Sequence, residues 1–117
     1  MGYDFHITRA SDWTHNTRYE ISAAEWLGYI RTDPELTPDP ENGPHAVVWS
    51  ARHEGEEVAW LDWCSGNVYT TNPDRARLRK MLEIARALGG WVQGDRGEVY
   101  ESVADFDEHA FETGRRP

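Results

Sequence analysis

The chain has 117 residues and a formal net charge of -9, from 21 acidic and 12 basic residues. This length fits one domain, and six Trp, five Tyr and three Phe supply enough apolar surface for one core, which argues against disorder. The sequence contains no apolar run of the roughly 20 residues that a membrane helix needs. A single Cys excludes an internal disulfide, and the net acidity argues against nucleic-acid binding. With no signal peptide at its start, we expect a cytoplasmic protein without a membrane partner.

The first predicted elements are a strand and a helix. Residues 3–9 alternate apolar and polar side chains, which is typical of a half-buried strand. Ser22 and Glu25 form an S-x-x-E capping box, in which each side chain accepts a hydrogen bond from the other residue's backbone N–H. This motif predicts a helix over 23–32. Its inward stripe is Ala23, Trp26, Leu27 and Ile30.

A proline-rich acidic segment follows the first helix. Residues 33–44 contain four prolines, which exclude a helix and a central strand and predict a stiff loop. The loop also carries four carboxylates, those of Asp33, Glu35, Asp39 and Glu41.

The second half of the predicted domain begins with a meander and continues with a helix and a hairpin. Residues 46–52, 58–63 and 68–71 predict three antiparallel strands. Asn72 as N-cap and Pro73 at the first helical position then predict a helix that ends at a glycine pair. The hairpin strands are expected over 91–93 and 98–101.

Together these elements predict an α+β fold. We expect a single domain over residues 1–101, an antiparallel sheet with two helices packed on one face, in the order β-α-β-β-β-α-β-β. Residues 102–117 are expected to form a short helix or a tail.

The sequence offers little support for catalysis. It contains no nucleophile elbow and no phosphate-binding glycine motif, and no His pair has metal-ligand spacing, so we predict no catalytic residue, no metal and no cofactor. His6 and Asp4 on the first strand make half a metal site at most, and a polar strand position is the favoured interpretation. The exception is Asp62, which lies between Trp60 and Trp63 and could line a ligand pocket with Trp60.

The acidic loop favours a different function, which is binding to a basic protein. Because prolines stiffen the loop, ordering it on binding requires little entropy. Its carboxylates would steer a basic partner electrostatically, with Trp60 or Trp13 as an anchor.

Several motifs resemble a family of small uncharacterised bacterial proteins. The resemblance lies in the opening Met-Gly-Tyr-Asp-Phe-His-Ile-Thr-Arg, in the two segments Asp-Pro-Glu-Leu and Asp-Pro-Glu-Asn-Gly-Pro of the loop, and in the segments over 92–95 and 97–100. It covers residues 1–101 and implies no catalytic residues. In size and acidity the chain also resembles the immunity proteins of bacterial toxin systems.

Three functions therefore remain open. The first is a non-catalytic, immunity-type inhibitor that neutralises a basic toxin or effector. The second is a small-ligand-binding protein or enzyme with its pocket near Trp60 and Asp62, and the third is a homo-oligomeric structural component. The sequence leaves open the partner, the oligomeric state, the burial of each Trp and the docking of residues 102–117.

Overall fold

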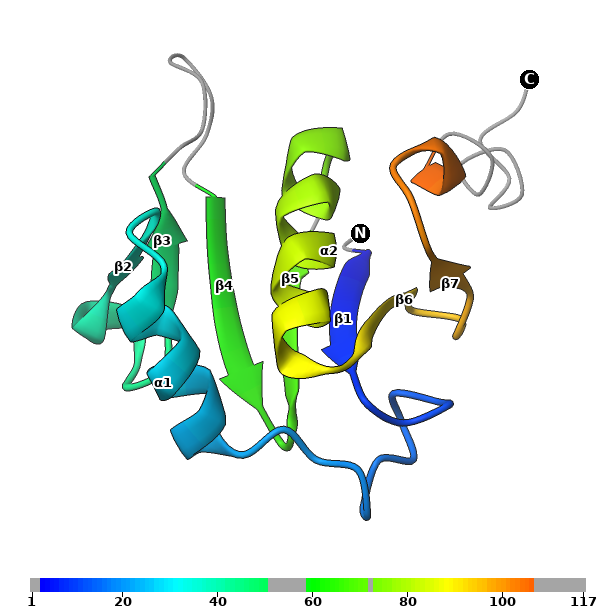
Figure 1. Cartoon of the computed structure of the whole chain (residues 1–117), viewed down its shortest axis with the longest axis horizontal. Coiled ribbons are helices and arrows are strands. Elements are labelled where there is room, and N and C mark those ends of the chain that lie inside the picture. The colour runs from blue at the N-terminus through cyan, green and yellow to red at the C-terminus, as the bar shows by residue number, and fades with distance from the viewer. Residues whose placement is uncertain (1–2, 51–58, 72, 107–117) are drawn as a thin grey trace.

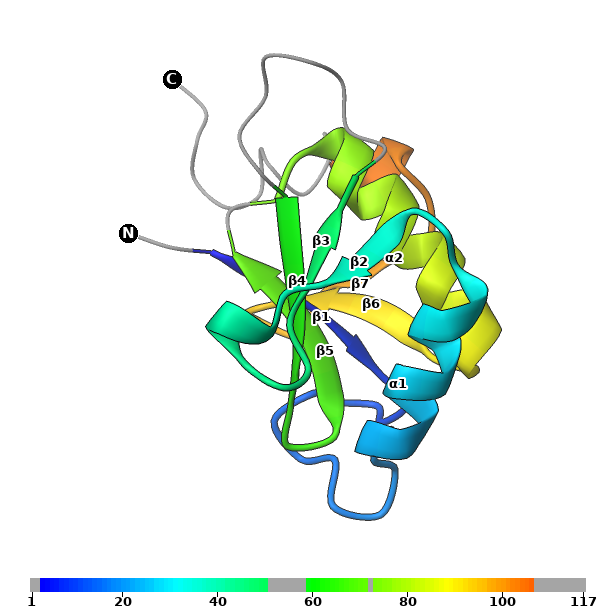
Figure 2. The same cartoon turned by 90° about the vertical axis from the view of Figure 1, so that its left-hand side faces the viewer.

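In the part of the chain that the structure describes, seven strands form one antiparallel sheet in the order β2-β3-β4-β5-β1-β6-β7. The structure is a computed structural model that describes residues 3–50, 59–71 and 73–106. Both α-helices cover the same face of the sheet (Figures 1 and 2), which confirms the predicted fold class. The elements are β1 (Asp4–Thr8), α1 (Ala23–Thr32), β2 (Leu36–Pro38), the 3-10 turn η1 (Pro40–Asn42), β3 (Val47–Trp49), β4 (Ala59–Cys64), β5 (Asn67–Thr71), α2 (Arg75–Leu88), β6 (Trp91–Gly94) and β7 (Val99–Tyr100).

The core lies between the sheet and the two helices. Alternation along each strand sends one set of side chains into this layer and the other set to the opposite face, which lies away from α1 and α2 (Figure 2). Phe5, Ile7, Leu61, Val68 and Val92 point into the core and are at most 1% exposed. The uncovered face, called the open face below, therefore receives the polar members of the same strands.

Helix α1 begins and ends as the sequence predicts. The Ser22 hydroxyl accepts a hydrogen bond from the Glu25 N–H at 3.0 Å, and the Glu25 carboxylate accepts one from the Ser22 N–H at 2.9 Å. The Arg9 guanidinium and then the Ser22 N–H lower the pKa of Glu25 to about 2. Trp26 and Ile30 fix the helix on the core, where both side chains are buried.

Helix α2 begins later than the sequence predicts. Its N-cap is Asp74, whose side chain accepts a hydrogen bond from the Arg77 N–H at 2.9 Å, so Pro73 precedes the helix and is not its first residue. The expected cap, Asn72, lies outside the described residues. The helix ends at Gly89, whose left-handed backbone (φ 73°) favours glycine. Within the described part of the chain, neither helix has the length and apolar character to span a membrane.

The proline-rich segment is more ordered than a loop. Leu36–Pro38 pairs with β3 at the edge of the sheet, and Pro40–Asn42 forms the 3-10 turn. Pro38 is tolerated there because one side of an edge strand has no neighbour to which its N–H would donate. At the other end of the chain, Phe106 packs edge-on against Phe5 of the core, with ring centroids 6.3 Å apart.

A buried ion cluster joins these parts. The Lys80 ammonium on α2 lies 2.8 Å from carboxylate oxygens of both Asp33 and Glu35 and 3.2 Å from that of Glu83. The Lys80 side chain is 2% exposed and that of Asp33 is 6% exposed. Asp33 also accepts a hydrogen bond from the Tyr29 hydroxyl at 2.6 Å. The cluster thus ties the end of α1 and the start of β2 to α2.

The cluster shifts the pKa of its members. Burial alone would raise the pKa of Asp33, but the hydrogen bonds from Lys80 and Tyr29 outweigh it and hold the pKa below its ordinary value. The hydrogen bond from Lys80 likewise lowers the pKa of Glu35. For Lys80 itself, burial acts to lower the pKa, yet the three carboxylates raise it overall. All three groups are therefore charged at neutral pH.

We predict that Lys80→Met destabilises the fold by about 3–5 kcal/mol, because Asp33 would be left as an uncompensated buried charge. Chemical denaturation at pH 7 measures the change. The matched control is Arg79→Met on the exposed side of the same helix, for which we expect a change within about 0.5 kcal/mol. Equal effects of the two substitutions would contradict the role of the cluster.

The cluster also predicts a loss of stability in acid. Because the pKa values of Asp33 and Glu35 are lower in the folded than in the unfolded state, their contribution is complete above about pH 4.5. It disappears as the pH falls through the lowered folded-state values. We expect the free energy of unfolding of Asp33→Asn to fall less steeply than that of the wild type over this range. Parallel pH profiles would contradict this assignment.

Candidate functional site

The open face brings polar and aromatic side chains of three strands together. Asp62 of β4 lies opposite Tyr69 of β5, and Tyr69 in turn lies opposite His6 of β1. Since side chains two residues apart share a face, Trp60 joins Asp62 and Asp4 joins His6. Five residues of three strands therefore lie on the same face, although β1 is far from β4 and β5 in the sequence.

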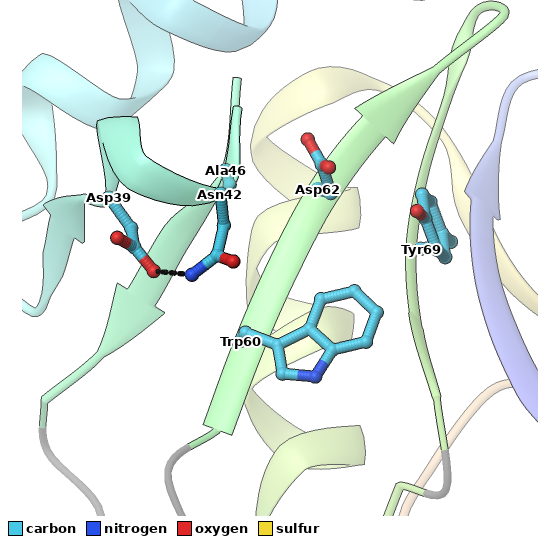
Figure 3. Close-up of a pocket in the computed structure, with 6 residues that line it drawn as sticks. All are labelled: Asp39, Asn42, Ala46, Trp60, Asp62 and Tyr69. Atoms are coloured by element: carbon cyan, nitrogen blue, oxygen red, sulfur yellow. Dashed lines mark hydrogen bonds between the residues drawn. The ribbon is translucent and has the colours of Figure 1, made fainter. Parts of the chain in front are cut away.

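A hollow of about 300 Å³ opens on this face between β4, β5 and the segment around η1. The Trp60 and Tyr69 rings meet edge to face, with centroids 5.5 Å apart. Figure 3 shows Trp60 and Asp62 on β4, with Asp39 and Asn42 on one side of them and Tyr69 on the other. The residues that line this hollow, called the Trp60 hollow, are Asp39, Asn42, Ala46, Trp60, Asp62 and Tyr69.

Two carboxylates give the Trp60 hollow a negative charge. Asp39 accepts a hydrogen bond from the Asn42 amide at 2.7 Å, and Asp62 accepts one from the Trp63 N–H at 2.7 Å. Within residues 3–50, 59–71 and 73–106, no cationic side chain forms an ion pair with either carboxylate. Burial raises the pKa of the Tyr69 hydroxyl, and the charge of Asp62 raises it further. The hollow therefore combines two aromatic rings with two carboxylates.

A second hollow of about 450 Å³ adjoins the first, because Tyr69 lines both. His6 and Trp13 stack there with ring centroids 3.5 Å apart and planes within 9° of parallel. The backbone of Trp13 is held by a hydrogen bond to the Gln93 side chain and one from the Asn67 side chain, each 2.9 Å long. The loop that precedes α1 is thus fastened onto the open face.

The structure places five of the seven predicted site residues in two separate groups. Asp39, Trp60 and Asp62 meet in the Trp60 hollow, as the pocket hypothesis requires of the last two. Asp33 and Glu35 instead lie in the Lys80 cluster, where Asp33 is buried, so the four loop carboxylates do not form one exposed patch.

The two remaining predicted site residues lie near the hollows. Glu41 is exposed on η1, and Trp13 covers His6 in the second hollow.

Sequence reasoning missed two residues of this surface, Tyr69 and Asp95. Alternation over 67–71 places Tyr69 on one face with Thr71, but no local sequence signal indicates which of the two faces of the sheet is open. Asp95 lies in a hairpin turn, 89 residues from the His6 side chain that it contacts. Only the pairing of β1 with both β5 and β6 brings them together.

Comparison of the chain with protein-family models, with curated proteins and with solved structures finds no match.

The electrostatics of the Trp60 hollow predict the titration of Tyr69. We expect Tyr69 to titrate above the ordinary tyrosine pKa of 10, and Asp62→Asn to move its pKa back toward that value because one neighbouring charge is removed. NMR of ring-labelled tyrosine follows the titration. Asp105→Asn, near β7, is the control and should leave the Tyr69 titration unchanged. An unchanged pKa of Tyr69 in the Asp62→Asn variant would contradict the proximity of the two groups.

Proposed function

We propose that the chain is a non-catalytic binding module that recognises a basic protein through the open face. The observation that carries this proposal is the Trp60 hollow, where Asp39 and Asp62 flank the Trp60 and Tyr69 rings without an ion-pair partner among the described residues. Such a site suits the cationic end of an arginine or lysine side chain.

The chemistry of the hollow favours arginine. A guanidinium offers several N–H donors in a plane and can pair with carboxylates while its face rests on an aromatic ring. Trp is the best ring for a cation–π contact, worth about 2 kcal/mol when the contact is desolvated. Because Trp60 is half-buried against Tyr69, its ring is already held in place before a partner arrives.

Charge and rigidity support an inhibitory role. The net charge of -9 would accelerate the approach of a basic partner, and Glu41 on η1 adds an exposed carboxylate beside the hollow. The Lys80 cluster anchors the segment that carries Asp39 and Glu41, so little order has to be gained on binding. An acidic, preorganised surface of this kind suits an immunity-type protein that covers the basic site of a toxin or effector.

The proposal predicts a specific loss on substitution of the hollow. A short arginine-rich peptide titrated into labelled protein should shift the NMR signals of Trp60, Asp62 and Tyr69 first. We expect Trp60→Ala combined with Asp62→Asn to weaken binding at least tenfold, and raised salt to weaken wild-type binding. A lysine-rich peptide of equal charge should bind more weakly than the arginine-rich one.

The matched control removes charge from another part of the surface. Asp12→Asn combined with Glu101→Gln alters two exposed acidic residues outside the Trp60 hollow, and it should retain wild-type affinity at a given salt concentration. The control removes two negative charges and the hollow variant removes one. A loss of affinity in the control at least as large as that in the hollow variant would therefore mean that binding follows net charge and that the hollow is not the recognition site.

A small-ligand-binding protein is the second candidate, and the size of the hollow favours it. At about 300 Å³, the Trp60 hollow lies at the lower end of the range of small-molecule pockets. A small guanidinium compound that binds to the hollow tightly enough to displace the peptide would favour this function. Sedimentation of the protein alone tests the third candidate, a homo-oligomer formed through the open face.

A further inference from the structure

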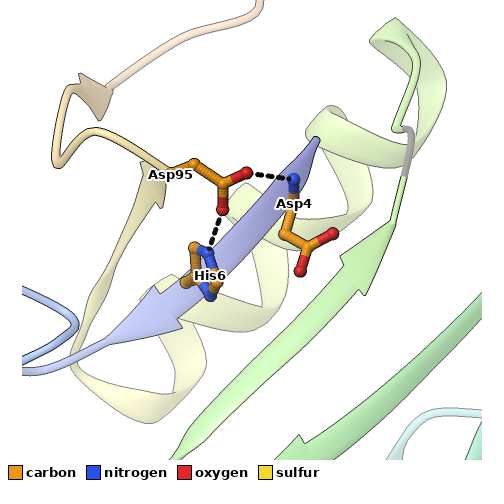
Figure 4. A group of neighbouring side chains, drawn as sticks. All are labelled: Asp4, His6 and Asp95. Carbon is orange, nitrogen blue, oxygen red and sulfur yellow. Dashed lines mark hydrogen bonds and ion pairs between the residues drawn. The ribbon is translucent and has the colours of Figure 1, made fainter. Parts of the chain in front are cut away.

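A cluster of three metal-ligating side chains lies at the other end of the open face. The ligand atoms of Asp4, His6 and Asp95 are all within 4.8 Å of one another. Asp4 and His6 are two residues apart on β1, and Asp95 directly follows β6, which is the neighbour of β1 in the sheet. Figure 4 shows the three side chains gathered on one side of β1.

The imidazole of His6 is held in a defined orientation. Its side chain is 6% exposed, and Trp13 stacks on it over the full ring with planes within 9° of parallel. The Nε2 atom points at Asp95 Oδ1, 2.9 Å away. Asp95 is fixed in turn, because its Oδ2 accepts a hydrogen bond from the Asp4 N–H at 3.1 Å. The stacking on Trp13 and the contact with Asp95 therefore order the imidazole before an ion binds.

The distances are compatible with one shared ion. Ligand atoms about 2.0–2.2 Å from a Zn²⁺ ion lie roughly 3–4 Å from each other, and His6 Nε2 and Asp95 Oδ1 are already close to this separation. The carboxylate of the half-buried Asp4 offers a third ligand atom within 4.8 Å of the other two. No hydrogen bond or ion pair within the described part of the chain holds the Asp4 carboxylate elsewhere.

The charge around the cluster also favours a cation. Asp4 and Asp95 approach each other closely, and within the described residues their only cationic neighbour is His6, which is neutral when it binds metal.

We propose that Asp4, His6 and Asp95 bind a divalent transition-metal ion, with Zn²⁺ as the expected occupant. One imidazole nitrogen and two carboxylate oxygens suit Zn²⁺ or Mn²⁺ better than Mg²⁺, which prefers oxygen ligands and keeps its water. Because Asp4 and His6 line the second hollow, the remaining coordination positions of the ion face an open space of about 450 Å³. Water or a group of a bound partner can occupy those positions.

Calorimetric titration of the full chain with ZnCl₂ tests the site. We expect one Zn²⁺ per chain, weaker binding of Mn²⁺, and no Mg²⁺ binding at equal concentration. Asp4→Asn and Asp95→Asn should each weaken Zn²⁺ binding at least tenfold. Asp4→Asn is the cleaner variant, because the hydrogen bond from residue 4 to Asp95 comes from the backbone and is retained. Circular dichroism shows whether each variant is folded.

The control is a second pair of a histidine and a carboxylate, for which the described residues offer no third ligand. His15 and Asp12 lie 3.6 Å apart on the exposed loop before α1. Asp12→Asn should leave Zn²⁺ binding unchanged. With Co²⁺ as a paramagnetic probe, the ring protons of His6 should shift and those of His15 should not.

Three results would overturn the proposal. These are no Zn²⁺ uptake by the wild type, wild-type affinity in a folded Asp4→Asn variant, and Co²⁺ shifts centred on a histidine other than His6. The proposal does not depend on the proposed function, since peptide binding at the Trp60 hollow is measured with other residues and without metal.

Discussion

The fold depends on one buried ammonium group. Lys80 projects from α2 into the place where α1 ends and β2 begins, and it holds carboxylates from both neighbours. A charge that is 2% exposed is stable only while its partners stay in place, so the cluster fixes three segments relative to one another. The Glu35 carboxylate extends this constraint into the sheet by accepting a hydrogen bond from the Trp49 indole at 3.1 Å. The start of the acidic segment is therefore held in place by a single cation.

That constraint reaches the open face. The segment anchored at Asp33 and Glu35 continues through β2 into η1, which lies on the side of the sheet opposite the helices (Figure 2). Asp39 therefore has a fixed position beside Trp60, and the wall of the hollow needs no partner to form it. The four carboxylates of the loop therefore have two different roles. Those of Asp33 and Glu35 stabilise the fold, whereas those of Asp39 and Glu41 remain for contact with solvent or a ligand.

Local sequence signals predicted most of the elements. The capping box at Ser22 and Glu25 acts within one helical turn, and so the bounds of α1 are as expected. The predicted start of α2 was wrong because Asn and Asp are both good N-cap residues, and both stand near this helix start, at positions 72 and 74. It is the Asp74 side chain that accepts the hydrogen bond from the Arg77 N–H. The edge strand β2 was missed because prolines disfavour a central strand but permit pairing at the edge of a sheet. Of the residues of the candidate site, the sequence suggested Trp60 and Asp62, because Asp62 lies between two Trp residues in the chain.

The sequence by itself determined most of the secondary structure elements, the single α+β domain and the acidic character of its surface. These properties follow from spacing and composition, which act over a few residues or over the whole chain. The tertiary structure decided which carboxylates are free. Asp33 and Lys80 are 47 positions apart, and His6 and Asp95 are 89 apart, so only the packing of α2 on α1 and the pairing of β1 with β6 bring them together. The sequence shows which residues carry a charge. Whether that charge is neutralised depends on its distance from an opposite charge, and strand order and register set this distance.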